Sequence, residues 1–195
     1  MSTRNREDGR GPYIRTVSGR KLYLLEPSAE QIYIPDVARH LAGTNRFNGC
    51  GISVAQHCVV GARLASRFYP DVALLPARFM VHDVAEAYLG DVSSPLKRCL
   101  DDYKVLERDW DAAVEDRFDV LFVGVPVVKE LDDRMWMTER LITQPMLSLA
   151  DDYAGPLEEF PLEKGELEEM FTPWGMEVAE HEYLVALREH LPWIS

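Results

Sequence analysis

The sequence has few cysteines, no long hydrophobic run and no excess of positive charge. Its three cysteines are Cys50, Cys58 and Cys99, and no two of them form a CxxC pair. An odd count without such a pair does not suggest a disulfide framework or a structural zinc knuckle, so a reducing compartment fits best. No apolar stretch approaches the roughly 18 residues that a membrane-spanning helix needs. The polar N-terminus has no secretion signal, and we expect a cytoplasmic protein without a membrane partner.

Basic side chains are outnumbered: 21 Lys and Arg stand against 33 Asp and Glu, which gives a formal net charge of -12. A field of this sign repels a nucleic-acid polymer. A small anionic substrate is still compatible with it, because a metal ion and a few Lys or Arg side chains reverse the sign locally. We therefore expect a small-molecule partner and no nucleic-acid polymer.

The 195 residues, 47% of them hydrophobic, are enough for one well-packed domain and short for two. Neither an internal repeat nor a low-complexity linker divides the chain. We expect a flexible N-terminal arm over residues 1–12 and one compact, all-α domain over residues 13–195. A short β-hairpin is predicted within residues 17–25, around Ser18 and Gly19.

Helical spacing of apolar residues dominates the rest of the chain. Ser53 followed by Gln56 has the form of a capping box, which places His57 about one turn into a helix. Pro76 is typical of a helix start and Gly90 of a helix stop. The predicted helices begin near residues 34, 53 and 95, cover 76–89 and 101–118, begin again near 126, and end with 178–190. Residues 151–165 are acidic and are predicted to form a loop.

Four side chains have the chemistry of a metal site. His82 and Asp83 are adjacent on the predicted helix 76–89, His57 lies on the helix before it, and Asp132 on a later one. Two imidazoles and two carboxylates suit a divalent first-row metal with positions left for water and substrate. A His-Asp pair alone is weak evidence, since a histidine among apolar neighbours is more often a hydrogen-bonded core residue.

The sequence around these residues strengthens the hypothesis. RFNG occupies residues 46–49, SVAQH 53–57, VHDVAEAYLGDVSSPLK 81–97 and VKELD 128–132. Together they resemble the HD-domain phosphohydrolase superfamily, and within it the branch of YfbR-like 5′-deoxynucleotidases and phage DatZ-type dATP triphosphohydrolases. The resemblance covers residues 46–139. It implies an HD-type helical bundle and the cytoplasm of a bacterial or phage-infected cell.

The resemblance also implies roles. His57, His82, Asp83 and Asp132 match metal ligands, for Zn, Co, Mn or Mg. Asp133 is the competing acid, and the offset of three residues from Lys129 favours Asp132. Glu86 and Asp91 match acids that assist hydrolysis. The residues expected to bind substrate are Arg46, Phe47, Lys97 and Lys129.

The leading hypothesis is a dNTP triphosphohydrolase that prefers dATP and releases deoxynucleoside and triphosphate. In this hypothesis Glu86 orients the attacking water and Asp91 supplies a proton to the leaving oxygen. The alternatives are a 5′-deoxynucleotidase acting on dNMPs, a non-catalytic nucleotide-binding regulator, and a hydrolase of cyclic or alarmone nucleotides. Self-association into a homo-oligomer is expected. Trp136, Trp174 and Trp193 are interpreted as packing residues.

Overall fold

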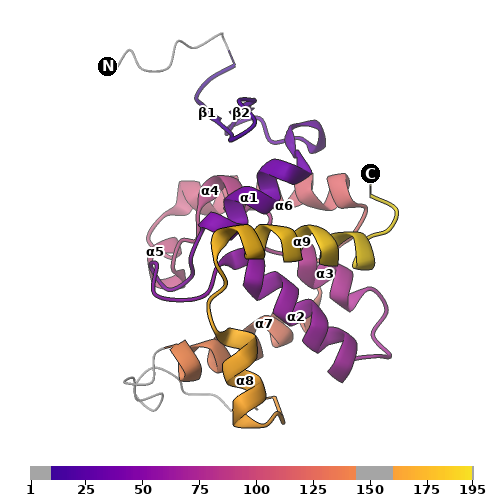
Figure 1. Cartoon of the computed structure of the whole chain (residues 1–195). Helices are drawn as coiled ribbons and strands as arrows, with labels where there is room; N and C mark the ends of the chain where they lie inside the picture. Colours follow the sequence, from indigo (N-terminus) through magenta and orange to yellow (C-terminus); the bar gives the residue numbers. More distant parts are fainter. Residues whose placement is uncertain (1–9, 144–159, 195) are drawn as a thin grey trace.

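Helices supply most of the fold, and a small hairpin stands at one end of it. The computed structural model describes residues 10–143 and 160–194. In Figure 1, α9 (Met176–His190) runs across α1 (Ile34–Gly43), α2 (Val54–Phe68) and α3 (Leu75–Val81), and these helices are packed against one another. The predicted mostly helical fold with an N-terminal hairpin is confirmed. Among the described helices, none combines the length and apolar character needed to cross a bilayer.

The hairpin is displaced from its predicted position. Its strands are β1 (Tyr13–Arg15) and β2 (Lys21–Tyr23), so the first strand precedes residue 17 and residues 16–20 form the turn. Gly19 has a φ of 83°, a left-handed conformation that glycine adopts without a steric penalty. The Ser18 backbone N–H and hydroxyl both donate to the Asp36 carboxylate, at 2.9 and 2.7 Å. Asp36 thus attaches the hairpin to the first turn of α1.

Most of the predicted arm, up to residue 9, lies outside the described residues. At its end, Arg10 donates to Glu26 at 2.8 Å and lies over the Tyr23 ring, with 4.0 Å from its guanidinium carbon to the ring centroid. Residues from Arg10 onward are therefore held against the hairpin.

The capping box predicted at Ser53 is half right. The Ser53 hydroxyl accepts a hydrogen bond from the Gln56 backbone N–H at 3.2 Å, as a helix N-cap should. The Gln56 side chain does not complete the box. It donates to the carbonyls of Met170 and Thr172, at 3.0 and 2.9 Å, and accepts from the Trp174 N–H at 2.9 Å. Gln56 therefore ties α2 to the segment between α8 (Lys164–Phe171) and α9.

The single helix predicted over residues 76–89 is wrong. α3 ends at Val81, residues 82–85 form turns, and α4 (Glu86–Leu89) follows and ends at Gly90. The His82 Nδ1 is 2.8 Å from the Phe79 carbonyl oxygen, which a regular helix would offer to the Asp83 N–H. The amides of Val84 and Glu86 bond three residues back, in the tighter 3₁₀ pattern. His82 and Asp83 therefore lie in the tighter turn between α3 and α4.

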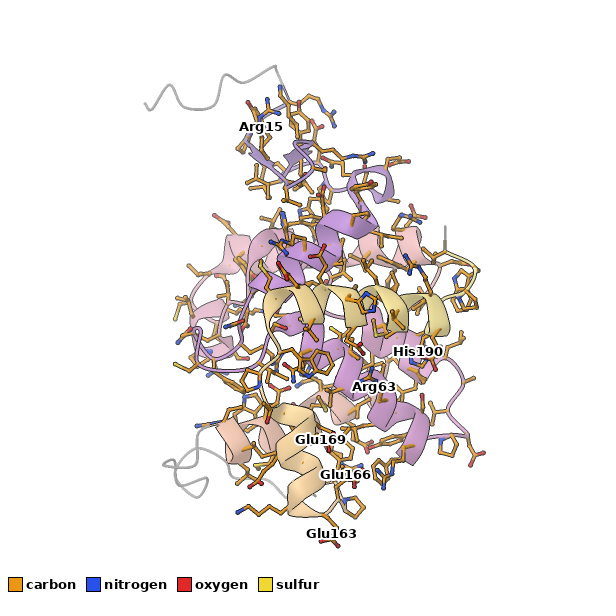
Figure 2. The ribbon with its side chains drawn as sticks, viewed as in Figure 1. Arg15, Arg63, Glu163, Glu166, Glu169 and His190 are labelled. Atoms are coloured by element: carbon orange, nitrogen blue, oxygen red, sulfur yellow. The ribbon has the colours of Figure 1, made fainter. Side chains whose placement is uncertain are left out.

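The remaining helices follow the predictions more closely. They are α5 (Ser94–Lys97), α6 (Asp101–Phe118), α7 (Pro126–Thr143) and α9, which begins two residues before its predicted start. Helix α8 was not predicted, because its acidic sequence resembles that of a loop. Of the loop predicted over residues 151–165, residues 160–163 are outside helices and strands, as predicted, and residues 151–159 lie outside the described residues. Figure 2 shows Glu163, Glu166 and Glu169 around α8, at the opposite end of the molecule from Arg15.

Helices α2 and α3 approach closely at Gly61. A Cβ atom at this position would lie 2.0 Å from Cε1 of Phe79, far inside van der Waals contact. The Phe79 ring in turn contacts two imidazoles: its centroid is 5.2 Å from that of His57 and 4.3 Å from that of His82. The absence of a side chain at residue 61 therefore sets the distance between the helices that carry the two histidines.

We predict that Gly61→Ala destabilises the protein by about 1–3 kcal/mol, since the new methyl group overpacks the α2–α3 contact. Displacing Phe79 should also weaken metal binding. Urea unfolding and a metal titration measure the two effects. Gly165→Ala is the matched control: it lies in α8 with no atom within 4 Å of the added Cβ. The control should leave stability unchanged or raise it, and equal destabilisation by both variants would contradict the prediction.

Candidate metal centre

The structure brings the four predicted metal ligands together. The His57 Nε2 is 3.4 Å from Oδ1 of Asp132 and 3.7 Å from Oδ2 of Asp83. The His82 Nε2 is 3.2 Å from Oδ1 of Asp83 and 3.9 Å from Oδ1 of Asp132. Potential ligand atoms of His57, His82 and Asp132 all lie within 4.8 Å of one another. Residues from α2, the α3–α4 break and α7 thus face one point.

Both imidazoles have one nitrogen fixed and the other directed at this point. The His82 Nδ1 faces the Phe79 carbonyl, which only accepts, so this nitrogen carries the proton. The His57 Nδ1 forms a short hydrogen bond with the Glu139 carboxylate. The Nε2 atoms of both residues are buried and have no hydrogen-bond partner among the described residues. Lone pairs facing carboxylate oxygens repel them unless a proton or a metal cation lies between, and two imidazoles with two carboxylates are a donor set that fits a divalent metal ion.

Asp132 and Asp133 have different surroundings. Asp132 faces the histidines, whereas Asp133 bonds to Lys129 and its side chain is 42% exposed. Neighbouring helical residues point about 100° apart, so only one of the two acids can face the centre. The geometry favours Asp132 as the ligand.

A fifth side chain, Cys58, lies near the centre. Together with His82 and Asp83 it forms a second group whose potential ligand atoms are within 4.8 Å of one another. Burial raises the pKa of the Cys58 thiol to about 11, although the His82 side chain acts in the opposite direction. The thiol is therefore neutral at ordinary pH and a poorer ligand than the two carboxylates.

Glu139 is the functional residue that the motif analysis missed. Its side chain is fully buried, contacts Nδ1 of His57, and accepts from Nε of Arg46 at 2.9 Å. Despite burial, the pKa of Glu139 is lowered, because Arg46 and His57 stabilise its charge. The available signal was its position seven residues after Asp132, which places both acids on one face of α7.

Arg46 was predicted to bind substrate, and the structure ties it to carboxylates. Besides Glu139, its guanidinium lies 3.4 Å from Asp83 and 3.9 Å from Asp132. It is 9% exposed. Arg46 also lines the pocket. Its guanidinium can therefore contact an anionic small molecule while it stays paired with the carboxylates of Asp83 and Asp132.

Glu86 and Asp91 lie beside the centre, at the start of α4 and just after its end. The Glu86 Oε2 is buried without a hydrogen-bond partner among the described residues, and its Oε1 is 3.6 Å from Nζ of Lys97. Burial raises the pKa of Glu86 well above its usual value, and Asp83 and Asp91 add to the effect. The pKa of Asp91 is raised by burial and, more weakly, by Asp83. Both carboxyl groups therefore have raised pKa values, as is common for acids that donate or accept protons in catalysis.

A polar pocket of about 850 Å³ opens onto the centre. That volume is in the range of small-molecule sites. Its acidic lining residues are Asp83, Glu86, Asp91, Asp132 and Asp133, and its basic ones are Arg46, Lys97, Arg98, Lys129 and Arg140. The aromatic lining residues are Phe47 and Trp136. All four residues predicted to bind substrate thus line this pocket, along with Arg98, Arg140 and Trp136, which had been given no such role.

The two lysines of the pocket are held by acids. Lys97 lies 2.5 Å from Glu107 of α6 as well as near Glu86. Lys129 bonds to Asp133 and is 3.5 Å from Asp132. These acids therefore fix the positions of the two ammonium groups and partly offset their positive charge.

Comparison with known proteins places the chain in a family. It is 36% identical over 131 residues to the uncharacterized protein YfdR of Escherichia coli (strain K12), an alignment that covers 66% of this chain and 70% of YfdR. The chain belongs to the YfdR family. It is also 36% identical over 123 residues to the uncharacterized protein RCAP_rcc00048 of Rhodobacter capsulatus, covering 58% of this chain and 59% of that protein.

No protein-family model matches the chain. Both YfdR and the Rhodobacter capsulatus relative are described as uncharacterized, so membership of the YfdR family adds no activity. The chemistry has to be inferred from the site itself.

We predict that Glu139→Gln lowers the affinity for Zn²⁺ or Mn²⁺ about 10- to 100-fold, the usual cost of losing a residue that orients a ligand. The amide keeps the shape but removes the charge facing His57 and Arg46. A chelator competition titration measures the affinity, and circular dichroism checks the fold. Glu130→Gln, at an exposed position of the same helix, should bind metal normally. An unchanged affinity in Glu139→Gln would remove Glu139 from the site.

Asp111 of α6 should make stability depend on pH. Burial, with Glu107 and Asp83, raises its pKa to about 7, against about 3.9 in an unfolded chain. The folded state therefore holds the proton more tightly, so stability falls as pH rises between these two values. Asp111→Asn should gain stability over the natural protein from pH 5 to pH 8, by at most about 4 kcal/mol, and show no gain at pH 3.5.

Urea unfolding in the presence of a chelator tests this, because a bound metal would alter the field of Asp83. Asp116→Asn, at an exposed position of the same helix, is the control and should show no such trend. A stability difference that is independent of pH would contradict the prediction.

Proposed function

We propose that the chain is a metal-dependent HD-domain phosphohydrolase that acts on deoxynucleotides, with dATP as the preferred substrate and deoxynucleoside and triphosphate as products. The observation that carries the proposal is the pair of buried, unpartnered Nε2 atoms facing two carboxylates beside a polar pocket. A purely structural histidine would have its second nitrogen satisfied. The motif order of the sequence supports the same conclusion.

His57, His82, Asp83 and Asp132 would hold the metal, with both imidazoles presenting Nε2. When bound, a divalent ion there supplies Lewis-acid polarisation of the phosphate and lowers the pKa of water near it. Glu139 and the Phe79 carbonyl keep the two rings in the required tautomer. Both imidazoles are thus held in the metal-binding tautomer before an ion binds.

Glu86 orients the attacking water, because its Oε2 has no hydrogen-bond partner among the described residues and Glu86 lines the same pocket as Asp83, three residues before it. The carboxyl group of Asp91, whose pKa is raised, delivers a proton to the leaving oxygen. Lys97 lines the pocket with its Nζ 3.6 Å from Oε1 of Glu86, where its ammonium group would neutralise charge that develops on phosphate oxygens.

The number of cationic groups in the pocket supports a triphosphate over a monophosphate. Five basic side chains line it, Arg46, Lys97, Arg98, Lys129 and Arg140, and a divalent ion held by the acids would offset the five carboxylates beside them. The preference for dATP rests on the resemblance to DatZ-type enzymes. The 5′-deoxynucleotidase alternative predicts a different product and is separated from this proposal by assay.

Purified protein is incubated with each dNTP, NTP and dNMP in the presence of Mn²⁺, Co²⁺, Zn²⁺ or Mg²⁺, with a chelator control. Release of tripolyphosphate from dATP, abolished by the chelator, is the expected result. Inorganic phosphate released from dNMPs alone would replace the proposal with the nucleotidase alternative. Binding without any turnover would favour a regulator.

Ligand variants test the metal centre in the same preparation. His82→Ala and Asp132→Asn should lose bound metal and at least about 100-fold in activity, whereas Asp133→Asn should retain the metal. Metal content by elemental analysis gives a readout that is independent of substrate. Full activity in His82→Ala would refute the centre.

A further inference from the structure

Trp136 borders the pocket in a way that differs from the other tryptophans. Trp110 is fully buried and donates its indole N–H to the Leu24 carbonyl. Trp193 is 45% exposed, and its indole N–H donates to the Phe118 carbonyl. Trp136 is half-buried and lines the polar pocket. Interpreting it as a packing residue leaves its position in the pocket wall without a reason.

We propose that Trp136 is the residue against which the nucleobase of the substrate stacks. This inference deepens the proposed function and rests on it for the substrate class, a deoxynucleoside phosphate. It concerns how the protein contacts the uncharged nucleobase of that substrate.

The position of Trp136 on α7 supports this role. Trp136 follows Asp132 by four residues and precedes Glu139 by three, so all three lie on one face of the helix. Four residues correspond to a rise of about 6 Å along the axis. The indole is therefore about one helical turn from the ligand carboxylate, close enough for one nucleotide to reach both the metal centre and the ring.

Phe47, on the loop after Arg46, also lines the pocket. Arg46 contacts Asp132 and Glu139, which lie on either side of Trp136 in the sequence of α7. These contacts attach the loop that carries Phe47 to the segment of α7 that carries Trp136.

The conformation of this loop is also fixed locally. Phe47 and Asn48 both adopt left-handed backbone angles, with φ of 54° and 55°. A Cβ atom at Gly51 would lie 2.6 Å from the Phe47 ring. Such constrained residues occur where the protein must hold one geometry, as at a binding site.

Each aromatic ring is paired with a guanidinium group. The Arg140 guanidinium carbon is 4.8 Å from the Trp136 ring centroid, and that of Arg46 is 5.7 Å from the Phe47 ring centroid. These cation–π contacts hold the rings in place before a ligand binds. An aromatic ring can then stack with a base at little cost in side-chain entropy.

The test compares a ligand that has a base with one that lacks it. The affinities for dATP and for tripolyphosphate are measured by isothermal titration calorimetry on the metal-loaded full chain, in a Glu86→Gln background that prevents turnover. Trp136→Leu should weaken dATP binding roughly 5- to 100-fold, the range for loss of one base–aromatic stack. It should leave tripolyphosphate binding within about twofold, and Trp136→Phe should restore most of the dATP affinity.

Trp193→Leu is the matched control, a tryptophan that does not line this pocket, and should change neither affinity. Equal weakening of dATP and tripolyphosphate by Trp136→Leu, or no weakening of either, would overturn the inference. If the protein turns over nucleotides but Trp136→Leu binds dATP normally, the inference fails while the proposed function stands. If dATP binding depends on Trp136 and no nucleotide is hydrolysed, the proposed function fails and the inference stands.

Discussion

The buried carboxylate of Glu139 is the interaction on which the site depends. It contacts His57 on one side and Arg46 on the other, and none of its surface is exposed to solvent. A buried charge is tolerated only when it is paired and hydrogen-bonded. The same pairing decides which nitrogen of His57 faces the centre and where the loop after Arg46 lies. One acid on α7 therefore couples the metal ligands to the wall of the pocket.

Two local departures from regular structure complete the arrangement. Gly61 allows α2 and α3 to approach until Phe79 contacts both imidazoles. At the break after Val81, Oδ2 of Asp83 lies 3.7 Å from Nε2 of His57, and Nε2 of His82 lies 3.9 Å from Oδ1 of Asp132. The bond between Nδ1 of His82 and the Phe79 carbonyl fixes the histidine tautomer.

Much of the helical framework was predictable from sequence because apolar periodicity, prolines and Ser53 mark helix positions directly. The bounds of α6 matched, and α7 began where Pro126 indicated. The break at residues 82–85 was not predicted, since the helical spacing of Phe79, Val84 and Ala87 continues across it. Helix α8 was missed because its burial comes from Phe171 packing against distant parts of the chain, which a local acidic sequence does not reveal.

For the candidate site, sequence motifs were sufficient to name four side chains that the structure brings together and Glu86 beside them, because these residues occur in short, ordered segments. They were not sufficient to find Glu139 or to place Trp136 in the pocket. Both residues acquire their surroundings only when α7 packs against α2 and the loop of residues 46–51. The pairing of Arg46 with three carboxylates likewise depends on tertiary contacts, so the sequence motifs did not reveal it.

Gln56 shows that the C-terminal segment is not an accessory to this site. It immediately precedes His57 in α2, and its amide satisfies backbone groups of Met170, Thr172 and Trp174. A fragment ending after α7 would leave this buried amide without its partners and would uncover the face of α2 that α9 covers. The smallest autonomous folding unit that can assemble this site therefore extends through α9, even though the four candidate ligands end at residue 132.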